Sequence, residues 1–338
     1  MKIIVIGAGI FGISTAIKLS QEHDVTLVDT NDDIMSNASK CNHNRLHFGF
    51  HYPRSIETAK QSLDGYESFY SNFKDSIIDN FPNYYMIERG SKINSRDYSL
   101  FCNDLGLDIK EVYPSIDMDL SNIESSYLTK EPIFDYESIK LTLKKMLDIS
   151  NVNIVLGKTI KDKSDVDEYD VIVNTTYSNI NKIKRLFDID DIKLRLQVVV
   201  VPIFRMDHER IGLTIMDGNY CSIMPKGFEE NNFLLYHVKN SVILETEGYT
   251  PPINWSDISI TKEDVDMIYE KSKEYFTFLE NSTPQGYWKT IRALPINNND
   301  CRLSDISCYE SNGKKIISVL SGKITTCWDV AENIKNMI

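Results

Sequence analysis

The sequence lacks any apolar run of the roughly 20 residues that a membrane-spanning helix needs, so it predicts no transmembrane segment. Its apolar start, "MKIIVIGAG", is short and leads into a glycine-rich turn, unlike a signal peptide. The six cysteines include no C-x-x-C pair, which argues against a zinc ribbon or a disulfide framework and suits a reducing compartment. The 37 basic residues are outnumbered by 49 acidic ones, which disfavours broad binding to nucleic acid. We therefore expect a cytoplasmic protein that does not bind nucleic acid.

The N-terminus contains a dinucleotide-binding pattern. Residues 2–7 form a short β-branched run typical of a buried strand, and "DVTLVD" predicts a second strand that ends at Asp29. Between them, Gly7, Gly9 and Gly12 stand in G-x-G-x-x-G register at the start of a helical pattern. In this motif the first glycine permits the turn, the second lets the backbone approach a pyrophosphate, and the third allows close packing of helix and strand. Asp29 is then placed to accept hydrogen bonds from an adenosine ribose. The N–H groups at the helix start, at Ile10 and Phe11, would face the phosphates.

A second unusual stretch, "NASKCNHNRLHFGFHYPRS", holds three of the six histidines. His43, His47 and His51 recur every four residues, as metal ligands on a helix do, but the glycine and proline nearby disfavour a helix. Because no companion residues show metal-ligand spacing, we expect no metal site. Hydrogen-bonded loop positions remain an alternative for His43 and His51.

Four segments resemble the FAD-dependent D-amino-acid oxidase superfamily. The histidine stretch is similar to the N-S-G-V-I-H-x-G-I-Y-Y-x-P-x-S-L-K-A segment of its L-2-hydroxyglutarate dehydrogenases. "SGKITTCWDVAENI" resembles a C-terminal segment of its glycerol-3-phosphate dehydrogenases, "GYWKTIRALP" resembles a G-x-R-P/A-L segment, and "EYDVIVNTTYSN" resembles A-D-x-V-V-N-A-T-G. In the last of these, Tyr177 replaces a glycine. The matching residues of the histidine stretch are Asn42, His47, Gly49, Tyr52, Ser55, Ala59 and Lys60.

The resemblance implies that FAD is the cofactor and that the histidine stretch passes beside its flavin ring. Small residues there, Ser39 and Gly49, would let the backbone approach the ring. His47 would contact the substrate or accept its proton, with His51 as a weaker candidate. Further residues expected to bind the cofactor are Asn42, Asn44, Arg45 and Asn174.

The C-terminal segments supply the remaining candidates. The resemblance implies that Arg292 holds a substrate carboxylate or phosphate, although a structural ion pair is the alternative. "KIISVLS" predicts a strand, and "TTCWDVAENIKNMI" predicts a helix capped by Thr325 or Thr326. The start of that helix would face the flavin and favour its reduction. The cofactor-binding candidates in this segment are Gly322, Lys323, Ile324 and Thr325.

Together these features predict an FAD-dependent oxidoreductase that oxidises a CH–OH or CH–N bond next to a carboxylate in a small anionic substrate. The resemblance to L-2-hydroxyglutarate dehydrogenases favours a 2-hydroxy acid, with hydride transfer to the flavin N5. An amine or amino-acid oxidase or dehydrogenase is the alternative, and a non-catalytic flavin-binding protein is an alternative of another class. Oxygen, a quinone or a protein remains open as the electron acceptor.

The resemblance implies an α/β fold, with a Rossmann-like FAD-binding domain interleaved with an α+β substrate domain built on an antiparallel sheet. Residues 1–80, 150–195 and 290–338 would form the first domain. Residues 81–149 and 196–289 would form the second. Helices are predicted from "SRDYSLFCNDLG", "DYESIKLTLKKMLDIS" and "TKEDVDMIYEKSKEYFTFLE".

Overall fold

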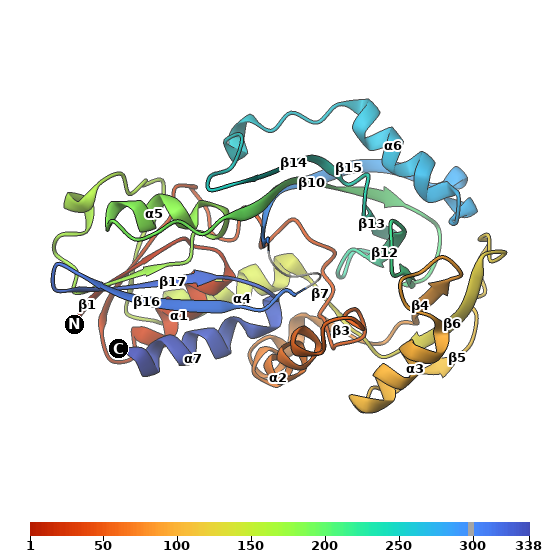
Figure 1. Ribbon diagram of the computed structural model, residues 1–338, viewed down its shortest axis with the longest axis horizontal. Coiled ribbons are helices and arrows are strands. Elements are labelled where there is room, and N and C mark those ends of the chain that lie inside the picture. Colours follow the sequence, from red (N-terminus) through yellow and green to blue (C-terminus); the bar gives the residue numbers. More distant parts are fainter. Residues whose placement is uncertain (297–300) are drawn as a thin grey trace.

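The computed structural model describes residues 1–296 and 301–338 and contains two large β-sheets. Figure 1 shows one sheet near the two chain termini and the other toward the opposite end, with β10 and β15 running between them. One sheet is mostly parallel with helices on both faces, and the other is mostly antiparallel. The predicted fold class, a Rossmann-like α/β domain interleaved with an α+β domain, is confirmed.

The first sheet has the strand order β16-β17-β9-β1-β2-β8. Its central strands are parallel, and only β16 runs antiparallel to its neighbour. Their buried faces are rich in β-branched residues because both sides of a parallel sheet are covered. The strands are β1 (Lys2–Ile6), β2 (Asp24–Val28), β8 (Val152–Val155), β9 (Val171–Asn174), β16 (Asp305–Ser311) and β17 (Lys314–Leu320).

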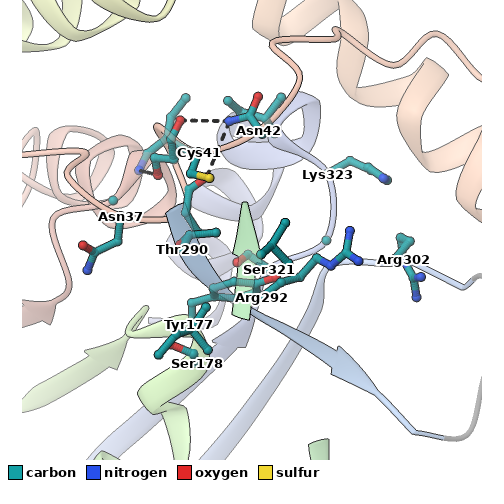
Figure 2. A pocket seen from close by; sticks show the side chains of 18 of the residues that line it. Asn37, Cys41, Asn42, Tyr177, Ser178, Thr290, Arg292, Arg302, Ser321 and Lys323 are labelled. Carbon is teal, nitrogen blue, oxygen red and sulfur yellow. Dashed lines mark hydrogen bonds between the residues drawn. The ribbon is translucent and has the colours of Figure 1, made fainter. Parts of the chain in front are cut away.

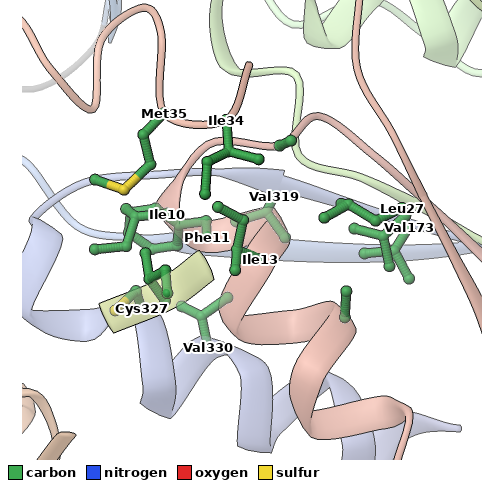
Figure 3. Close-up of a cluster of buried hydrophobic side chains, with 14 of the residues drawn as sticks. Ile10, Phe11, Ile13, Leu27, Ile34, Met35, Val173, Val319, Cys327 and Val330 are labelled. Carbon is green, nitrogen blue, oxygen red and sulfur yellow. The ribbon is translucent and has the colours of Figure 1, made fainter. Parts of the chain in front are cut away.

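Helices cover this sheet on both faces (Figure 1). On one side, α1 (Ile10–Leu19) packs between α7 (Cys327–Met337) and α4 (Tyr136–Asp148). Figure 3 shows their interior, where side chains of α1 and α7 meet those of the sheet strands. On the other side, α5 (Ile180–Leu186) closes a smaller apolar cluster. The carboxyl ends of β1 and β9 are therefore the free edge at which a ligand can bind.

The second sheet has the order β14-β10-β13-β12-β11-β4-β6-β5, and β15 pairs with β10 along its length. All its pairs are antiparallel except that of β4 with β11. A two-stranded sheet of β3 (Ile77–Ile78) and β7 (Ile133–Phe134) lies apart. The strands of the second sheet are β4 (Asn83–Glu88), β5 (Lys110–Glu111), β6 (Ile123–Thr129), β10 (Leu194–Arg205), β11 (Gly212–Met216), β12 (Cys221–Pro225), β13 (Asn232–His237), β14 (Val242–Gly248) and β15 (Thr283–Pro295).

The predicted helices form, with one shortened. Asn94 and Asp135 accept hydrogen bonds from backbone N–H groups at the starts of α3 and α4, as expected of N-caps. The third predicted helix, over 261–280, stops at Lys273 and resumes as a 3-10 turn, so that its aromatic residues can pack against the second sheet. The other helices are α2 (Ile56–Phe73), α3 (Ser95–Asp104) and α6 (Lys262–Lys273), and the 3-10 turns are η1 (Lys74–Ser76), η2 (Lys163–Val166), η3 (Tyr177–Asn179), η4 (Trp255–Asp257), η5 (Thr277–Asn281) and η6 (Ile324–Thr326).

The two sheets draw on alternating parts of the chain. The first sheet uses residues up to 28, then 152–174 and 305–320, and the second uses 83–129 and 194–295. Strand β15 therefore stays with the second sheet up to Pro295, five residues beyond the boundary expected at 290. Residues 297–300, within the last predicted segment, lie outside the described residues. No helix in the described ranges is long and apolar enough to cross a membrane.

Candidate active site

A cavity of about 990 Å³ lies between the two sheets and is lined by residues of both. At one end it reaches the glycine turn after β1 and the end of β2. At the other end it reaches β10, β13 and β15 of the second sheet. The cavity therefore connects the predicted dinucleotide site to the predicted substrate site. Figure 2 shows the latter part.

The glycine turn is shaped for the close approach of a ligand backbone. Gly7 has a positive φ of 110°, which L-residues with a side chain rarely adopt. A Cβ at Gly12 would lie 1.8 Å from the Gly7 carbonyl oxygen, so only glycine fits where α1 meets β1. Gly9 caps α1 in an extended conformation with no side-chain hydrogen bond, and of the first N–H groups of the helix that of Ile10 donates to Ser39. The following N–H groups at the helix start can face an anion. This turn fits the pyrophosphate of a dinucleotide.

Two polar side chains complete this end of the cavity. Asp29 follows β2, and its Oδ2 accepts a hydrogen bond from the Ala8 N–H at 2.6 Å. Its Oδ1 accepts two hydrogen bonds from Asn31. Because Oδ2 accepts only the Ala8 bond among the described residues, it has a lone pair left for a ribose hydroxyl. The Ser39 hydroxyl accepts a bond from the Ile10 N–H at 3.1 Å and so anchors the histidine stretch at the start of α1.

His47 lies at the cavity wall with a carboxylate behind it. Its Nδ1 lies 3.7 Å from Glu131 Oε1, and its Nε2 lies 3.4 Å from the Tyr52 hydroxyl. Its side chain is 17% exposed. Burial, helped by the charges of Lys323 and Arg45, lowers the pKa of His47 well below its usual value. The imidazole is therefore neutral at pH 7, and a neutral imidazole can accept a proton.

His43 and His51 also line the cavity. The His51 ring packs against His47 at a centroid distance of 5.3 Å, and His43 lies 3.3 Å from the Ser222 hydroxyl. Burial lowers the pKa of both rings well below the usual value. In the described part of the chain, no three His, Cys, Asp or Glu side chains come together as metal ligands do.

Arg45 is a buried link between the histidine stretch and the second sheet. Its guanidinium lies 3.2 Å from Glu131 Oε2 and donates to the Thr214 hydroxyl at 2.6 Å. It also contacts the Tyr85 hydroxyl, which donates to the same carboxylate. Arg45 and Glu131 are 4% and 1% exposed, so the two charges neutralise each other away from water. Although it borders the cavity, Arg45 has its donors committed to these partners.

Arg292 is held by its cross-strand neighbour. Gln197 on β10 stands opposite Arg292 on β15, and its Oε1 accepts from the Arg292 Nε at 2.9 Å and from Nη2 at 2.6 Å. The guanidinium carbon lies 5.7 Å from the centre of the Tyr236 ring. No carboxylate of the described residues pairs with Arg292. Its remaining donors are available to an anionic ligand in the cavity.

The turn after β17 adds a third cationic group. Lys323 Nζ lies 4.2 Å from the centre of the Tyr52 ring. Burial and the charge of Arg45 lower the pKa of Lys323 to about 7. Helix α7 begins after η6, and the Thr326 hydroxyl donates to the Lys323 carbonyl and makes no cap to the helix.

The backbone at Tyr177 takes a conformation that glycine favours. Its φ of 53° lies in the left-handed region that glycine favours. The side chain lies near Arg292 and lines the cavity (Figure 2). The departure from the expected motif therefore adds a side chain to the cavity wall, on a backbone conformation that a glycine could also adopt.

The cavity wall brings together most of the predicted residues. These are Gly7, Gly9, Ile10, Phe11, Asp29, Ser39, Asn42, Arg45, His47, His51, Arg292, Gly322, Lys323 and Ile324.

Five predicted residues lie outside the wall, with structural contacts of their own. Gly12 packs under the turn, and Gly49 faces Leu107 and the Ala59 carbonyl. The Asn44 carbonyl accepts from the Phe134 N–H, Asn174 donates to the Ile180 carbonyl, and Thr325 packs against Gly65.

Several residues of the site had no clear signal in the sequence. Glu131 and Arg302 stand in loops with no recognisable motif, and only the structure brings them to this place. Gln197 had a signal, because it is an amide within an otherwise apolar part of β10. A polar side chain in such a run usually has a specific partner.

Basic side chains dominate the described cavity wall. Besides the paired Arg45 and Arg54, it contains Lys92, Lys158, Lys182, Arg292, Arg302 and Lys323. The only described carboxylates on the wall are Asp29 and Asp217, and Asp217 pairs with Arg54 at 2.5 Å. In a protein with a net charge of −12, this local excess of positive charge points to anionic ligands.

Known proteins resemble this chain in sequence and in fold. A family model described as FAD dependent oxidoreductase (DAO) matches residues 2–90. The FAD-dependent monooxygenase FPY4 of Fusarium mangiferae is 22% identical and covers 99% of this chain and 90% of its own length. The fold is similar to glycine oxidase from Geobacillus kaustophilus (TM-score 0.76, 12% identity, 99% and 93% of the two chains). It is also similar to L-proline dehydrogenase from P. horikoshii (TM-score 0.72, 15% identity, 99% and 93%).

The match over residues 2–90 and the similar folds support the predicted superfamily. The findings confirm the FAD cofactor and the assignment as an enzyme. The glycine turn, the open start of α1 and the long cavity fit FAD on the geometry of the chain alone. The preference for a 2-hydroxy acid and the cytoplasmic location stay predictions.

Proposed function

We propose that this FAD-dependent oxidoreductase of the D-amino-acid oxidase superfamily oxidises a CH–OH bond next to a carboxylate in a small anionic molecule. One observation carries the proposal: the wall of the cavity is rich in cations, and Arg292 has donors free of any described carboxylate. A hydroxy acid brings a negative charge to this wall and no positive one. When bound, FAD supplies the electron acceptor for the oxidation.

Arg292 would bind the substrate carboxylate. Its guanidinium is fixed from behind by Gln197, so little conformational freedom is lost when an anion binds. The paired donors of a guanidinium match the two oxygens of a carboxylate. This contact would fix which bond of the substrate faces the flavin.

His47 would accept the hydroxyl proton as the C–H bond is oxidised. Its pKa is lowered, so at pH 7 the ring is ready to take a proton. Glu131, 3.7 Å behind the ring, would stabilise the imidazolium that forms. Lys323, with its pKa lowered to about 7, is a second group that could take this role.

Oxidation of an amine or amino acid is the second candidate, favoured by the glycine oxidase and L-proline dehydrogenase folds that this chain resembles. An amino acid, however, reaches the cavity as a zwitterion, and its ammonium group would meet a wall rich in Lys and Arg. The positive wall therefore favours the hydroxy acid. A non-catalytic flavin-binding protein is the candidate of another class.

Anaerobic bleaching of the bound flavin would separate these candidates. The purified holoprotein is mixed without oxygen with a panel of 2-hydroxy acids and the matching amino acids, and the flavin absorbance is followed. We expect bleaching by hydroxy acids. Bleaching by amino acids alone would support the second candidate, and no bleaching by either set would support the non-catalytic one.

His47→Ala tests the proposed proton acceptor. We expect the bleaching rate to fall by about 100-fold, the usual scale of general-base catalysis, with flavin content unchanged. His208→Ala is the matched control because His208 lies in a loop and bonds only the adjacent Glu209 carbonyl. An unchanged rate in His47→Ala would contradict the role.

A further inference from the structure

Arg302 is a second arginine on the cavity wall beside Arg292. Figure 2 shows the Arg292 guanidinium pointing toward Arg302, with Lys323 on the same side of the pocket. The described side-chain hydrogen bond of Arg302 goes to the Cys301 carbonyl at 3.4 Å, at the long limit for such a bond. Its backbone N–H donates to the Thr58 hydroxyl at 3.0 Å, which fixes the chain there.

Two guanidiniums held close together repel each other. Burial and the nearby charge of Arg292 lower the pKa of Arg302 to about 10, and no carboxylate of the described residues pairs with its guanidinium. Elsewhere on this wall the arginines are compensated: Arg45 pairs with Glu131 and Arg54 with Asp217. Uncompensated, partly buried charges destabilise a fold unless a ligand neutralises them.

The cofactor phosphates do not explain this pair. The pyrophosphate has its site at the glycine turn and the start of α1, where Gly7 and Gly9 line the other end of the cavity. Arg292 instead stands on β15 of the second sheet, and Arg302 stands just before β16, on the wall of the same cavity. An anion bound there belongs to the substrate.

We propose that Arg302 binds a second anionic group of the substrate, so that the natural substrate carries two negative groups, one bound by each arginine. This rests on the proposed function, in which Arg292 binds the first carboxylate. The second group is a carboxylate or a phosphate, since a guanidinium binds the oxygens of both. Molecules with one anionic group would leave Arg302 uncompensated.

Binding of anions that cannot be oxidised tests this proposal without turnover. Glutarate, butyrate and phosphonoacetate are titrated into the holoprotein, and the shift of the flavin absorbance gives each dissociation constant. We expect glutarate or phosphonoacetate to bind at least about 10-fold more tightly than butyrate, the effect of one charged hydrogen-bonded contact. The tighter of the two identifies the second group as a carboxylate or a phosphate.

Substitution of Arg302 assigns the effect. Arg302→Gln should remove the advantage of the doubly charged ligand and change butyrate affinity by less than about 3-fold, and Arg302→Lys should restore part of it. Arg205→Gln, at an exposed arginine of β10, is the matched control. Equal affinities of the singly and doubly charged ligands for the wild type would overturn the proposal, whatever the stability of the variants. So would equal weakening of both by Arg302→Gln.

These outcomes are distinct from failure of the proposed function. If hydroxy acids bleach the flavin but doubly charged ligands bind no better than butyrate, only the second anion site is wrong. If no anion perturbs the flavin and no substrate bleaches it, both are wrong.

Discussion

Acidification from pH 7 to about pH 5.5 should destabilise this protein through its three clustered histidines. Burial lowers the pKa of His43, His47 and His51 well below the usual 6.5. Below pH 6.5 the unfolded chain therefore binds protons that the folded chain does not. The free energy of unfolding is therefore not reduced by these histidines above pH 6.5, and it falls as the pH drops below this value.

The magnitude follows from proton linkage. Each histidine that stays neutral in the folded state contributes a loss of about 1.4 kcal/mol per pH unit below its unfolded pKa. For three rings the loss between pH 7 and 5.5 is roughly 3–4 kcal/mol, a large share of the 5–15 kcal/mol typical of a domain. His237, whose pKa is also lowered by burial, acts in the same direction. The pKa of Asp33 is lowered to about 2, so its contribution to the free energy of unfolding is lost only in a more acidic range.

Urea unfolding of the holoprotein, followed by circular dichroism at several pH values and a fixed excess of FAD, measures this loss. His51→Asn should reduce the slope of the free energy against pH by about one proton. His208→Asn, in an exposed loop contact, should leave the slope unchanged. A free energy of unfolding that stays constant between pH 7 and 5.5 would refute the reasoning.

Three further changes test other parts of the structure. Gly12→Ala would place a Cβ 1.8 Å from the Gly7 oxygen, so we expect flavin loss and more than about 2 kcal/mol of destabilisation in urea. Gly248→Ala, with open space around it, should behave as wild type. Glu131→Gln should cost about 3 kcal/mol in the same assay because it leaves a buried arginine without its carboxylate, and an unchanged midpoint would contradict this. Butyrate affinity should fall as the pH rises through about 7, where Lys323 loses its proton, and Lys323→Met should flatten that profile in the flavin titration.

The part of the fold that could be predicted from the sequence is the part with local rules. The unit from Lys2 to Asp29 follows from glycine spacing and β-branched runs, because backbone sterics and burial fix both within a few residues. The caps at Asp135 and Thr261 are also local, since each bonds a backbone N–H three residues on. The predicted end of the third helix was wrong because the aromatic residues after Lys273 pack against the second sheet. This packing is a tertiary contact, which the local pattern does not reveal.

The site could be predicted only in part, again because tertiary contacts build it. His47 and Arg292 stand in recognisable segments, and the structure places both on one cavity. Their supports, Glu131 and Gln197, are separated from them by 84 and 95 residues along the chain, so only the folded sheets bring them close. Gly49 matched the motif and Asn44 stands in the same stretch, yet their positive φ values serve the course of the loop.

The pairing of β10 with β15 has a consequence for how this enzyme family can vary. Twelve consecutive residues of β10, Leu194–Arg205, are matched to partners in β15, and the pair Gln197–Arg292 sits inside that ladder. Since neighbouring side chains of a strand point to opposite sides, one inserted residue ahead of Arg292 in β15 would turn its guanidinium out of the cavity. The ladder already contains one irregularity, between Ile203 and Phe204, and the pairs between it and Gln197–Arg292 restore the register that keeps Arg292 on the cavity side.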